Sequence, residues 1–400
     1  MQDLKKNDLQ VLQTIFSHEN ATRLHIAKET GFSLAHISSI LSNLSGNCYI
    51  IKKGKTQSAS GRPSIIYQIR PDLGHSLGIS VKPSSIRIVT IDFSKKVIFE
   101  KNYQLRLSPD PSAHTNDIIM QILQRITEML EKPPLGQLPI VSVGIALPGM
   151  VDTIRNIWLQ GLHVSGVTHI NMVDEIQKRI NIPIFIEDES RALAYREKFL
   201  GYGLELENFV LLYLDEGMGT GVISHDNIFR GYHGLSGEIG HIAHPGSSYR
   251  CRCNNIGCME TILSIQGIIR IFRERLKEGV RSTLHEYVKG NEIDLTLEGI
   301  LAAADQGDRL AQTTLFEIGR YIGDAVVILI KMFNPQRIII SGSVSVFKNY
   351  FRDPIHLVLN QQVHSEMLHD FSVHFSNYEV SHEAQGAALI GLVHYLSRKI

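Results

Sequence analysis

Three short runs of residues in the first 45 positions repeat their apolar side chains at helical spacing. The first run covers 7–17, the second 21–30 and the third 33–45. Their apolar faces are formed by Leu9, Leu12, Ile15 and Phe16, by Leu24, Ile26 and Ala27, and by Leu34, Ile37, Ile40, Leu41 and Leu44. Asn20 is placed to cap the second helix, Gly31 lies where the chain must turn sharply, and Ser33 can cap the third. Helix, short glycine turn and helix together predict a helix-turn-helix.

A basic hairpin follows these helices. Residues 49–69 read YIIKKGKTQSASGRPSIIYQI, which predicts a strand, a Gly/Ser-rich turn and a second strand, the wing of a winged helix. The outward face of the third helix carries short, mostly polar side chains that suit a DNA groove, and the wing carries cations that suit phosphates. The predicted DNA-binding residues are Ser33, Leu34, His36, Ser38, Ser39, Asn43, Lys52, Lys53, Lys55 and Arg62. The alternative is a small three-helix cap with a solvated hairpin.

From Leu73 onward, apolar strand patterns alternate with helical patterns. Three strands open this region, helices are expected at about 114–131, 172–180, 260–332 and 383–397, and further Ile/Val-rich strands lie between them. Such alternation predicts a pair of α/β domains. We therefore divide the chain into a winged helix-turn-helix domain, 1–72, and an α/β domain, 73–400.

Composition and charge narrow the possible functions. Hydrophobic residues make up 43% of the chain and charged residues 20%, as in ordinary globular proteins. The sequence shows no apolar stretch near 18 residues and no signal-peptide pattern, so we expect a cytoplasmic protein with no membrane partner. Net charge is zero overall, but nine basic and five acidic residues give 1–72 a charge of +4. A modest excess of this kind is typical of a nucleic-acid-binding end.

The cysteines are concentrated. Three of the four, Cys251, Cys253 and Cys258, lie within eight positions, with His241 and His244 shortly before them. In a reducing compartment an odd, tightly spaced set favours metal over disulfides. Zinc prefers four such ligands in a tetrahedron, and the residues alone leave either histidine available as the fourth.

The run from GEIGH (237–241) to CRCNNIGCMET (251–261) resembles the zinc signature of the ROK family, which comprises repressors, open reading frames and sugar kinases. The segments VSVGIALPGMVD, FNPQRIIISGSVS and EAQGAALIG are similar to other ROK segments. With a winged helix in front, the resemblance covers nearly the whole chain and points to the repressor branch, whose members respond to xylose, N-acetylglucosamine or glucose.

This resemblance implies a two-lobed, actin-like (ribonuclease H-like) α/β fold with a sugar in the cleft, assembled as a homodimer or homotetramer. It implies one structural zinc per chain, held by His241 with the three cysteines, and it places Glu238 and Glu260 against sugar hydroxyls. Carboxylates suit that role because their oxygens accept hydrogen bonds in fixed directions. The alternative is that these two glutamates only cap adjacent helices.

The nucleotide loops of a ROK kinase are altered here. In GISVKPSSI, Ser80 stands where the kinases have aspartate, and Lys82 and Pro83 replace two glycines of the phosphate turn. Proline removes a backbone donor, and the side chains fill space that phosphates need. In LDEGMGTGV, Asp215 and Glu216 replace glycine and threonine, and two carboxylates repel a triphosphate.

Two sugar-site positions differ as well. Glu189 of IEDESRA stands at the position of the catalytic aspartate and is one methylene longer, which displaces a base by about 1 Å. In GLHVSGV, His163 replaces a sugar-contacting asparagine. We therefore predict a regulator without kinase activity whose sugar-binding residues are Glu238, His241, Glu260, Glu189 and His163. The alternatives are an ATP-dependent sugar kinase and a regulator whose sugar cleft is inactive and which answers to a protein partner.

The predicted mechanism joins these parts. Two winged helices of a dimer bind a palindromic operator, with the third helix in the major groove and Arg62 reaching toward the minor groove. A sugar then favours a different lobe angle and so changes operator affinity.

Overall fold

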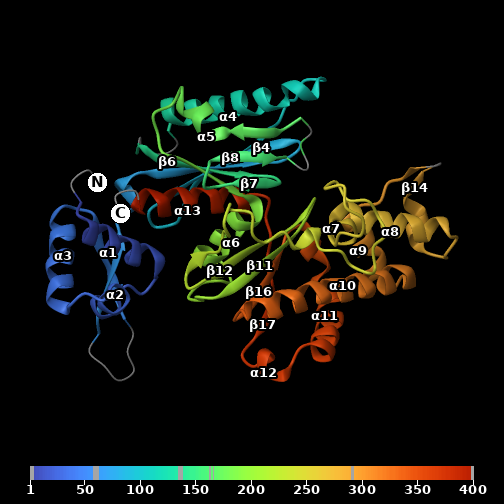
Figure 1. Ribbon diagram of the computed structural model, residues 1–400. Coiled ribbons are helices and arrows are strands. Elements are labelled where there is room, and N and C mark those ends of the chain that lie inside the picture. Colours follow the sequence, from blue (N-terminus) through green and yellow to red (C-terminus); the bar gives the residue numbers. More distant parts are fainter. Residues whose placement is uncertain are drawn as a thin grey trace. The chain divides into compact units, whose positions relative to one another are not determined.

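A computed structural model of the chain describes residues 4–56, 63–133, 138–161, 164, 166–289 and 292–397. The chain packs as two compact units (Figure 1). Unit 1 consists of Met1–Leu200 and Ser381–Ile400, and unit 2 of Gly201–Val380. Because the packing places the first helices and the first α/β lobe in one unit, the predicted domain boundary at residue 72 stays a prediction.

Unit 1 begins with the predicted winged helix. It contains α1 (Lys6–Ser17), α2 (Arg23–Thr30), α3 (Leu34–Gly46) and the antiparallel strands β1 (Ile50–Lys55) and β2 (Ile65–Ile69). Gly31 ends α2 at φ +72°, a conformation that favours glycine, and its N–H donates to the Ala27 carbonyl. The Ser33 hydroxyl caps α3 by accepting from the His36 N–H. The predicted turn and the third cap are confirmed.

The predicted cap of the second helix was wrong. The Thr22 hydroxyl, and not Asn20, accepts from the His25 N–H at the start of α2. Just before the helix, the Ala21 carbonyl accepts from the Tyr67 N–H and Thr22 forms an antiparallel bridge with Ile66. Pairing with the wing holds this segment extended, so the helix begins two residues later than the sequence suggests.

The α/β part of unit 1 is built on a five-stranded mixed sheet. Its strands are β3 (His75–Val81), β4 (Ser85–Asp92), β5 (Val97–Gln104), β6 (Ile140–Leu147) and β10 (Ile184–Asp188), in the order β10-β6-β3-β4-β5. The first three form the predicted antiparallel meander, whereas β6 runs parallel to both β3 and β10. A smaller sheet joins β7 (Met150–Asp152), β8 (Ile157–Gln160) and β9 (Thr168–Asn171).

Helices cover both faces of this sheet. In Figure 1, α4 (His114–Glu131) and α5 (Met172–Gln177) lie on one side, while α13 (His382–Ser397) lies on the other and packs on β3 and β6 beside α6 (Glu189–Leu200). Helix α13 fits closely against the strands, because a Cβ at Gly144 would lie 1.8 Å from the Ala387 carbonyl oxygen. Glycine is therefore required at this position of β6.

Unit 2 also contains a five-stranded mixed sheet, of order β13-β12-β11-β16-β17. The strands are β11 (Phe209–Leu214), β12 (Met218–Ser224), β13 (Asn227–Ile228), β16 (Arg337–Ser341) and β17 (Ser372–Phe375). Its helices are α7 (Glu260–Leu263), α8 (Ile265–Lys277), α9 (Leu297–Asp305), α10 (Arg309–Phe333), α11 (Lys348–Gln362) and α12 (Ser365–Leu368), and β14 (Val288–Lys289) pairs with β15 (Glu292–Ile293). The core lies between the sheet and α8 to α11.

The predicted α/β fold class with a leading winged helix is confirmed by these elements. Within the described ranges, every helix is too short or too polar to cross a bilayer.

Candidate functional site

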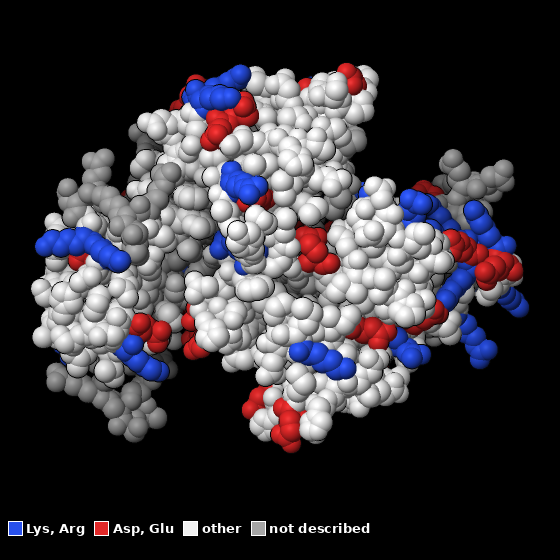
Figure 2. Space-filling model, in the orientation of Figure 1, with Lys and Arg blue, Asp and Glu red and all other residues white. Residues whose placement is uncertain are grey.

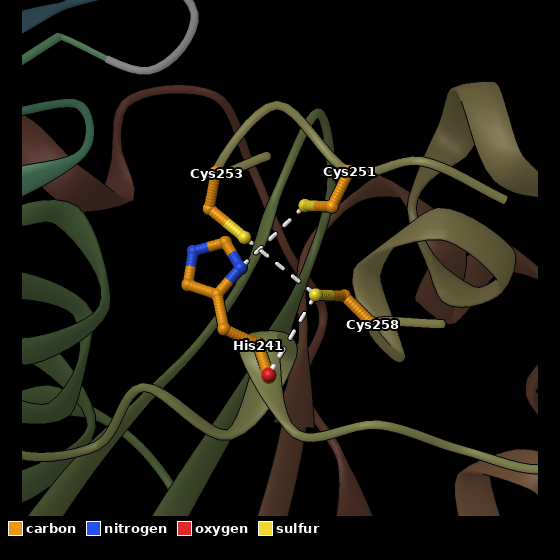
Figure 3. A group of neighbouring side chains, drawn as sticks. All are labelled: His241, Cys251, Cys253 and Cys258. Carbon is orange, nitrogen blue, oxygen red and sulfur yellow. Dashed lines mark hydrogen bonds between the residues drawn. The ribbon is translucent and has the colours of Figure 1, made fainter. Parts of the chain in front are cut away.

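The three clustered cysteines and one histidine converge in unit 2. His241 ends the short 3-10 helix η3 (Ile239–His241), and Cys251, Cys253 and Cys258 lie on the loop that leads into α7 (Figure 3). One potential ligand atom from each residue lies within 4.8 Å of the others. The predicted ligand set is therefore brought together by the fold.

The spacing of these atoms suits a tetrahedral metal. Cys253 Sγ lies 3.6 Å from Cys258 Sγ, and Cys251 Sγ lies 3.6 Å from His241 Nδ1. Zinc bonds of about 2.3 Å to sulfur and about 2.0–2.1 Å to nitrogen place neighbouring tetrahedral ligands about 3.5–3.8 Å apart. The donor set and its geometry both fit such an ion.

The backbone of the cysteine loop is a tight turn. Asn254 has φ +72°, a left-handed conformation that asparagine adopts more readily than most residues. The Asn254 N–H donates to the Cys251 carbonyl, and the Cys251 N–H donates to the Asn255 carbonyl. An antiparallel bridge between Arg250 and Ile256 closes the turn. These bonds fix the backbone of the turn that carries Cys251 and Cys253.

His244, the alternative fourth ligand, has other partners. Its Nε2 lies 3.1 Å from Asp324 Oδ2, its Nδ1 accepts from the Gly246 N–H, and its ring contacts Tyr321 edge-on. The imidazole is buried and fixed by these contacts. The structure therefore groups His241, and not His244, with the cysteines.

Burial shapes the ionisation of the thiols. It raises the pKa of Cys251 to about 12 and also raises the pKa of Cys258. Burial opposes ionisation of Cys253 too, but the Asn255 backbone N–H and the neighbouring thiols outweigh it and lower that pKa. A metal cation would deprotonate all three, because coordinating thiols bind as thiolates.

The two predicted sugar-binding glutamates of unit 2 differ in their surroundings. Glu238 Oε2 lies 3.8 Å from His241 Nε2, whereas Nδ1 is the ring nitrogen near Cys251 Sγ, and the Glu238 side chain is 41% exposed. Glu260 is buried; it accepts from the Met218 N–H at 3.1 Å and from Cys251 Sγ at 3.7 Å. Glu260 thus ties the cysteine loop to the glycine-rich turn before β12, and Glu238 makes no capping bond to η3.

The glycine-rich turn is held closed by hydrogen bonds from Ser343 and Glu216 to the Asp215 carboxylate, a set of contacts that we call the latch. Asp215 is 6% exposed, and its Oδ2 accepts from the N–H and the hydroxyl of Ser343, at 3.1 and 2.9 Å. Its Oδ1 accepts from the Glu216 N–H at 2.9 Å. Ser343 begins η5 (Ser343–Phe347), within the segment FNPQRIIISGSVS that is similar to a ROK segment. Sequence reasoning identified Asp215 as repulsive to phosphate but missed its partner, 128 positions away.

In unit 1, the other altered phosphate loop is occupied by an ion-pair cluster that is formed by Lys82 and two glutamates. Lys82 Nζ lies 2.8 Å from Glu189 Oε1 and 2.9 Å from Glu383 Oε1, and Glu383 is fully buried. The lysine that replaces a phosphate-turn glycine is therefore paired with the glutamate that replaces the catalytic aspartate. Glu383 lies in the first turn of α13, and sequence reasoning missed it because only the packing brings it to Lys82.

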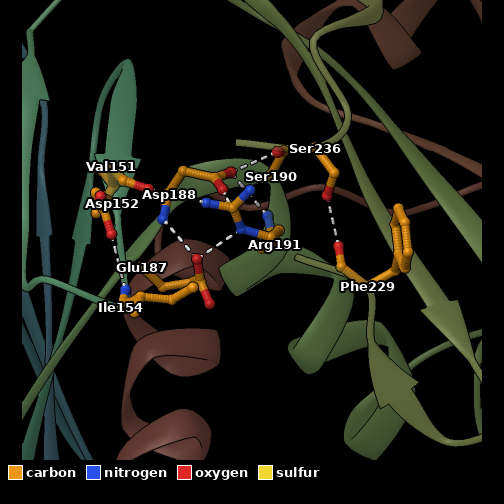
Figure 4. A network of polar contacts seen from close by, with 9 residues as sticks. All are labelled: Val151, Asp152, Ile154, Glu187, Asp188, Ser190, Arg191, Phe229 and Ser236. Carbon is orange, nitrogen blue, oxygen red and sulfur yellow. Dashed lines mark hydrogen bonds and ion pairs between the residues drawn. The ribbon is translucent and has the colours of Figure 1, made fainter. Parts of the chain in front are cut away.

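Next to Glu189, a buried network fixes the start of α6 (Figure 4). Arg191 Nε lies 2.6 Å from Glu187 Oε1 and 2.5 Å from Asp188 Oδ2, and the Ser190 hydroxyl donates to Asp188 Oδ1. Burial raises the pKa of Asp188, and Arg191 partly offsets this. The network gives α6 a rigid first turn behind Glu189.

The described residues of the predicted DNA-binding surface lie on α3 and β1. On α3, Leu34 is 44% exposed, and His36, Ser39 and Asn43 are exposed as well. Ser33 and Ser38 have local partners, since Ser33 caps α3 and the Ser38 hydroxyl donates to the Leu34 carbonyl. The wing lysines Lys52, Lys53 and Lys55 are exposed. Arg62 and the predicted sugar contact His163 lie outside the described residues.

Known proteins are similar to this chain over most of its length. The model of the ROK family matches residues 77–396. A xylose repressor of Caldicellulosiruptor bescii is 26% identical over 97% of this chain and 94% of its own length, and the regulator NagC of Escherichia coli is 27% identical over 89% of this chain and 85% of its own.

Solved structures are similar too. A ROK family transcriptional regulator, described as a homologue of the E. coli MLC protein, shares 28% identity and a TM-score of 0.82 over 98% of both chains. A ROK glucokinase of Streptomyces griseus, solved with glucose and AMPPNP, matches 80% of this chain and 99% of its own with a TM-score of 0.67 and 22% identity. At this sequence identity, the similarity to the kinase shows a shared fold only.

Proposed function

This chain belongs to the ROK family, and we propose that it is a sequence-specific, DNA-binding transcriptional repressor of carbohydrate-metabolism genes without kinase activity. Relatives that span nearly the whole chain are named as xylose repressors, and the similar regulator structure covers the winged helix as well as the α/β part. The shared two-lobed architecture is that of the ROK kinases, so the fold alone does not separate the two functions.

The observation that carries the proposal is the state of both nucleotide loops. A phosphate loop needs free backbone N–H groups and room for the phosphate oxygens. Here the Ser343 and Glu216 N–H groups already donate to Asp215, and the Lys82 ammonium already pairs with Glu189 and Glu383. The groups that would bind a triphosphate are engaged with carboxylates of the protein.

We further propose that the His241, Cys251, Cys253 and Cys258 cluster holds one structural zinc ion per chain. With four protein ligands, the ion would have no open position for substrate and would act by fixing the loop. Glu260, two residues after Cys258, would hold the glycine-rich turn in place through the Met218 N–H, and its hydrogen bond from the Cys251 thiol would be lost once Cys251 binds zinc as a thiolate. Glu238 would orient the His241 ring from its far nitrogen.

The proposed effector is a sugar or sugar derivative, contacted by Glu238, His241 and Glu260 of unit 2 and by Glu189 and His163 of unit 1. Polar side chains held by second partners suit hydroxyl recognition, because fixed acceptors discriminate between epimers. Glu189 is positioned by Lys82, and Glu260 by the Met218 N–H. A regulator whose sugar site is inactive and which answers to a protein partner is the competing outcome.

On the DNA side, we propose that a homodimer or homotetramer of chains, each with a winged helix formed by 1–72, reads a palindromic operator. The exposed face of α3 would enter the major groove, with Lys52, Lys53 and Lys55 near phosphates and Arg62 near the minor groove. By contrast, the region of α8 shows both signs of charge (Figure 2), and its exposed side chains include Arg273 and Lys277 as well as Glu274. Mixed charge of that kind does not suit a DNA backbone.

The test starts from DNA bound by the full chain in a selection from a random library. Asn43→Ala should weaken binding to the selected site by about 1–3 kcal/mol. Lys52→Gln with Lys55→Gln should reduce the slope of log affinity against log salt by about 2. Lys277→Gln on α8 serves as the matched control and should change neither.

The same selected DNA then tests the effector. Monosaccharides, amino sugars and their phosphates are titrated into the complex, and the expected response is a shift of about 1–3 kcal/mol in operator affinity for one of them. A chain that selects no DNA sequence refutes the regulator, and sugar-dependent ADP release in a parallel assay supports the kinase instead. An operator affinity indifferent to every sugar tested refutes the effector.

A further inference from the structure

Lys82 connects the starts of two helices of unit 1. Its ammonium lies between Glu189, the first residue of α6, and Glu383, the second residue of α13. The three side chains are 19%, 13% and 0% exposed, respectively. One cation therefore holds two carboxylates that would repel each other at this depth if it were absent.

The two helices run from this contact as neighbours. They pack against each other, and α13 also packs on β3, the strand that leads into Lys82. Helix α6 has 12 residues and α13 has 16, which correspond to lengths of about 18 Å and 24 Å. Both are rigid elements on the scale of a small domain.

Both helices end on the winged helix. Near the end of α6, the Phe199 ring lies 5.3 Å from the Phe16 ring of α1. At the end of α13, the Ser397 hydroxyl accepts a hydrogen bond from Gln13 of α1, at 2.7 Å. Lys95, on the turn between β4 and β5, places its ammonium 5.2 Å from both aromatic rings. Helices α6 and α13, which both begin at Lys82, therefore both contact α1 at their far ends.

We propose that Lys82 is a positioning residue that couples the effector-site carboxylate of Glu189 to α1 of the winged helix, through α6 and α13. The coupling rests on the proposed function, because it takes Glu189 as a contact for the effector. A ligand that donates hydrogen bonds to the Glu189 carboxylate competes with Lys82 for it, whereas the ion pair between Lys82 and the buried Glu383 is kept. The start of α6 is then released relative to α13, and their far ends shift against α1.

The geometry explains why the pair serves this purpose better than an apolar contact. A ligand can break the Lys82–Glu189 ion pair and leave the Lys82–Glu383 pair intact, because Glu189 is reachable from solvent and Glu383 is not. Two elements with discrete packing arrangements carry such a change over their whole length. If the ion pairs of Lys82 only stabilised unit 1, as a brace, removing them would destabilise the whole unit and would have no selective effect on α1.

The experiment is hydrogen–deuterium exchange, followed by mass spectrometry, on the full chain without DNA or sugar. In Lys82→Gln, the amides of residues 6–17 should exchange at least tenfold faster, while those of the β3–β4 hairpin and of unit 2 keep their wild-type rates. Lys82→Arg, which keeps the charge, should restore the protection of α1. Lys101→Gln on β5, the same substitution at an exposed lysine of the same sheet, should leave all rates unchanged.

Glu383→Gln gives a second test that does not leave two carboxylates unpaired, and it covers the case in which Lys82→Gln fails to fold. It too should speed exchange in residues 6–17 selectively. Unchanged exchange in α1, or equal acceleration throughout unit 1, overturns the coupling and leaves Lys82 as a brace. Because the measurement contains no operator and no effector, its outcome is independent of the tests of the proposed function.

Discussion

Replacing Asp215 by alanine should open the latch of the glycine-rich turn and destabilise unit 2. The carboxylate accepts three hydrogen bonds, two from Ser343 and one from Glu216, at 2.9–3.1 Å. Hydrogen bonds to a charged group are worth about 1.5–3 kcal/mol each. Ser343 and Glu216 are only half-buried, so water replaces part of what is lost. We expect the free energy of unfolding to fall by about 3 kcal/mol.

Asp215→Asn should cost less, about 1–2 kcal/mol, because one acceptor oxygen remains while the amide group cannot accept from Ser343. Guanidinium denaturation measures both variants. The single tryptophan, Trp158, lies in unit 1, so its fluorescence reports on that unit, whereas circular dichroism reports on both. The variants should shift the dichroism transition and leave the fluorescence midpoint in place.

Asp353→Ala, at an exposed position of α11, is the control and should change the unfolding free energy by less than about 0.5 kcal/mol. If Asp215→Ala unfolds at the same denaturant concentration as the wild type, the latch contributes nothing. If Asp215→Gly, which restores the residue type of the kinases, gains tight binding of magnesium ATP, the loop is not closed by Asp215 and our reading of the nucleotide side is wrong.

Three further predictions concern other parts of the chain. Cys258→Ala should lower bound zinc from about one ion per chain to near zero, as measured by elemental analysis. The control Cys48→Ala should keep the zinc content of the wild type. Zinc retained by Cys258→Ala would contradict the ligand set. Burial lowers the pKa of Lys95 from 10.5 to about 8. Between these pH values the unfolded state holds more protons than the folded state, so the unfolding free energy should rise with pH. Lys95→Met should flatten this rise, and an unaltered dependence on pH would exclude Lys95 as its source. Gly144→Ala should cost more than about 3 kcal/mol in thermal or chemical unfolding, because its Cβ would lie 1.8 Å from the Ala387 carbonyl oxygen, and a wild-type melting temperature would refute this.

Features fixed by local sequence were predictable. The helix-turn-helix follows from apolar spacing and from Gly31, whose positive φ almost any other residue would resist. The three cysteine ligands follow from the spacing of the thiols, whereas the choice of His241 over His244 rested on the family resemblance. In each case the cause lies within a few residues of the effect.

Features that depend on distant partners were not predictable. Asn20 was predicted to cap α2, but Thr22 caps it, because pairing of Thr22 with the wing decides where that helix starts. Lys82 was interpreted as a residue that blocks a phosphate turn, yet its role depends on Glu383, in the last helix of the described chain. A single sequence carries no signal that joins two such positions.

The assembly of unit 1 from two distant segments has a consequence for its synthesis. Helix α13 leaves the ribosome about 300 residues after β3, the strand on which it packs. At about 5–20 residues per second, that interval lasts about 15–60 s, and throughout it one apolar side of the first sheet has no cover. The nascent chain should therefore be a client for chaperones that shield sheet surfaces, and a ribosome that stalls before residue 382 would release a sheet that cannot complete its core.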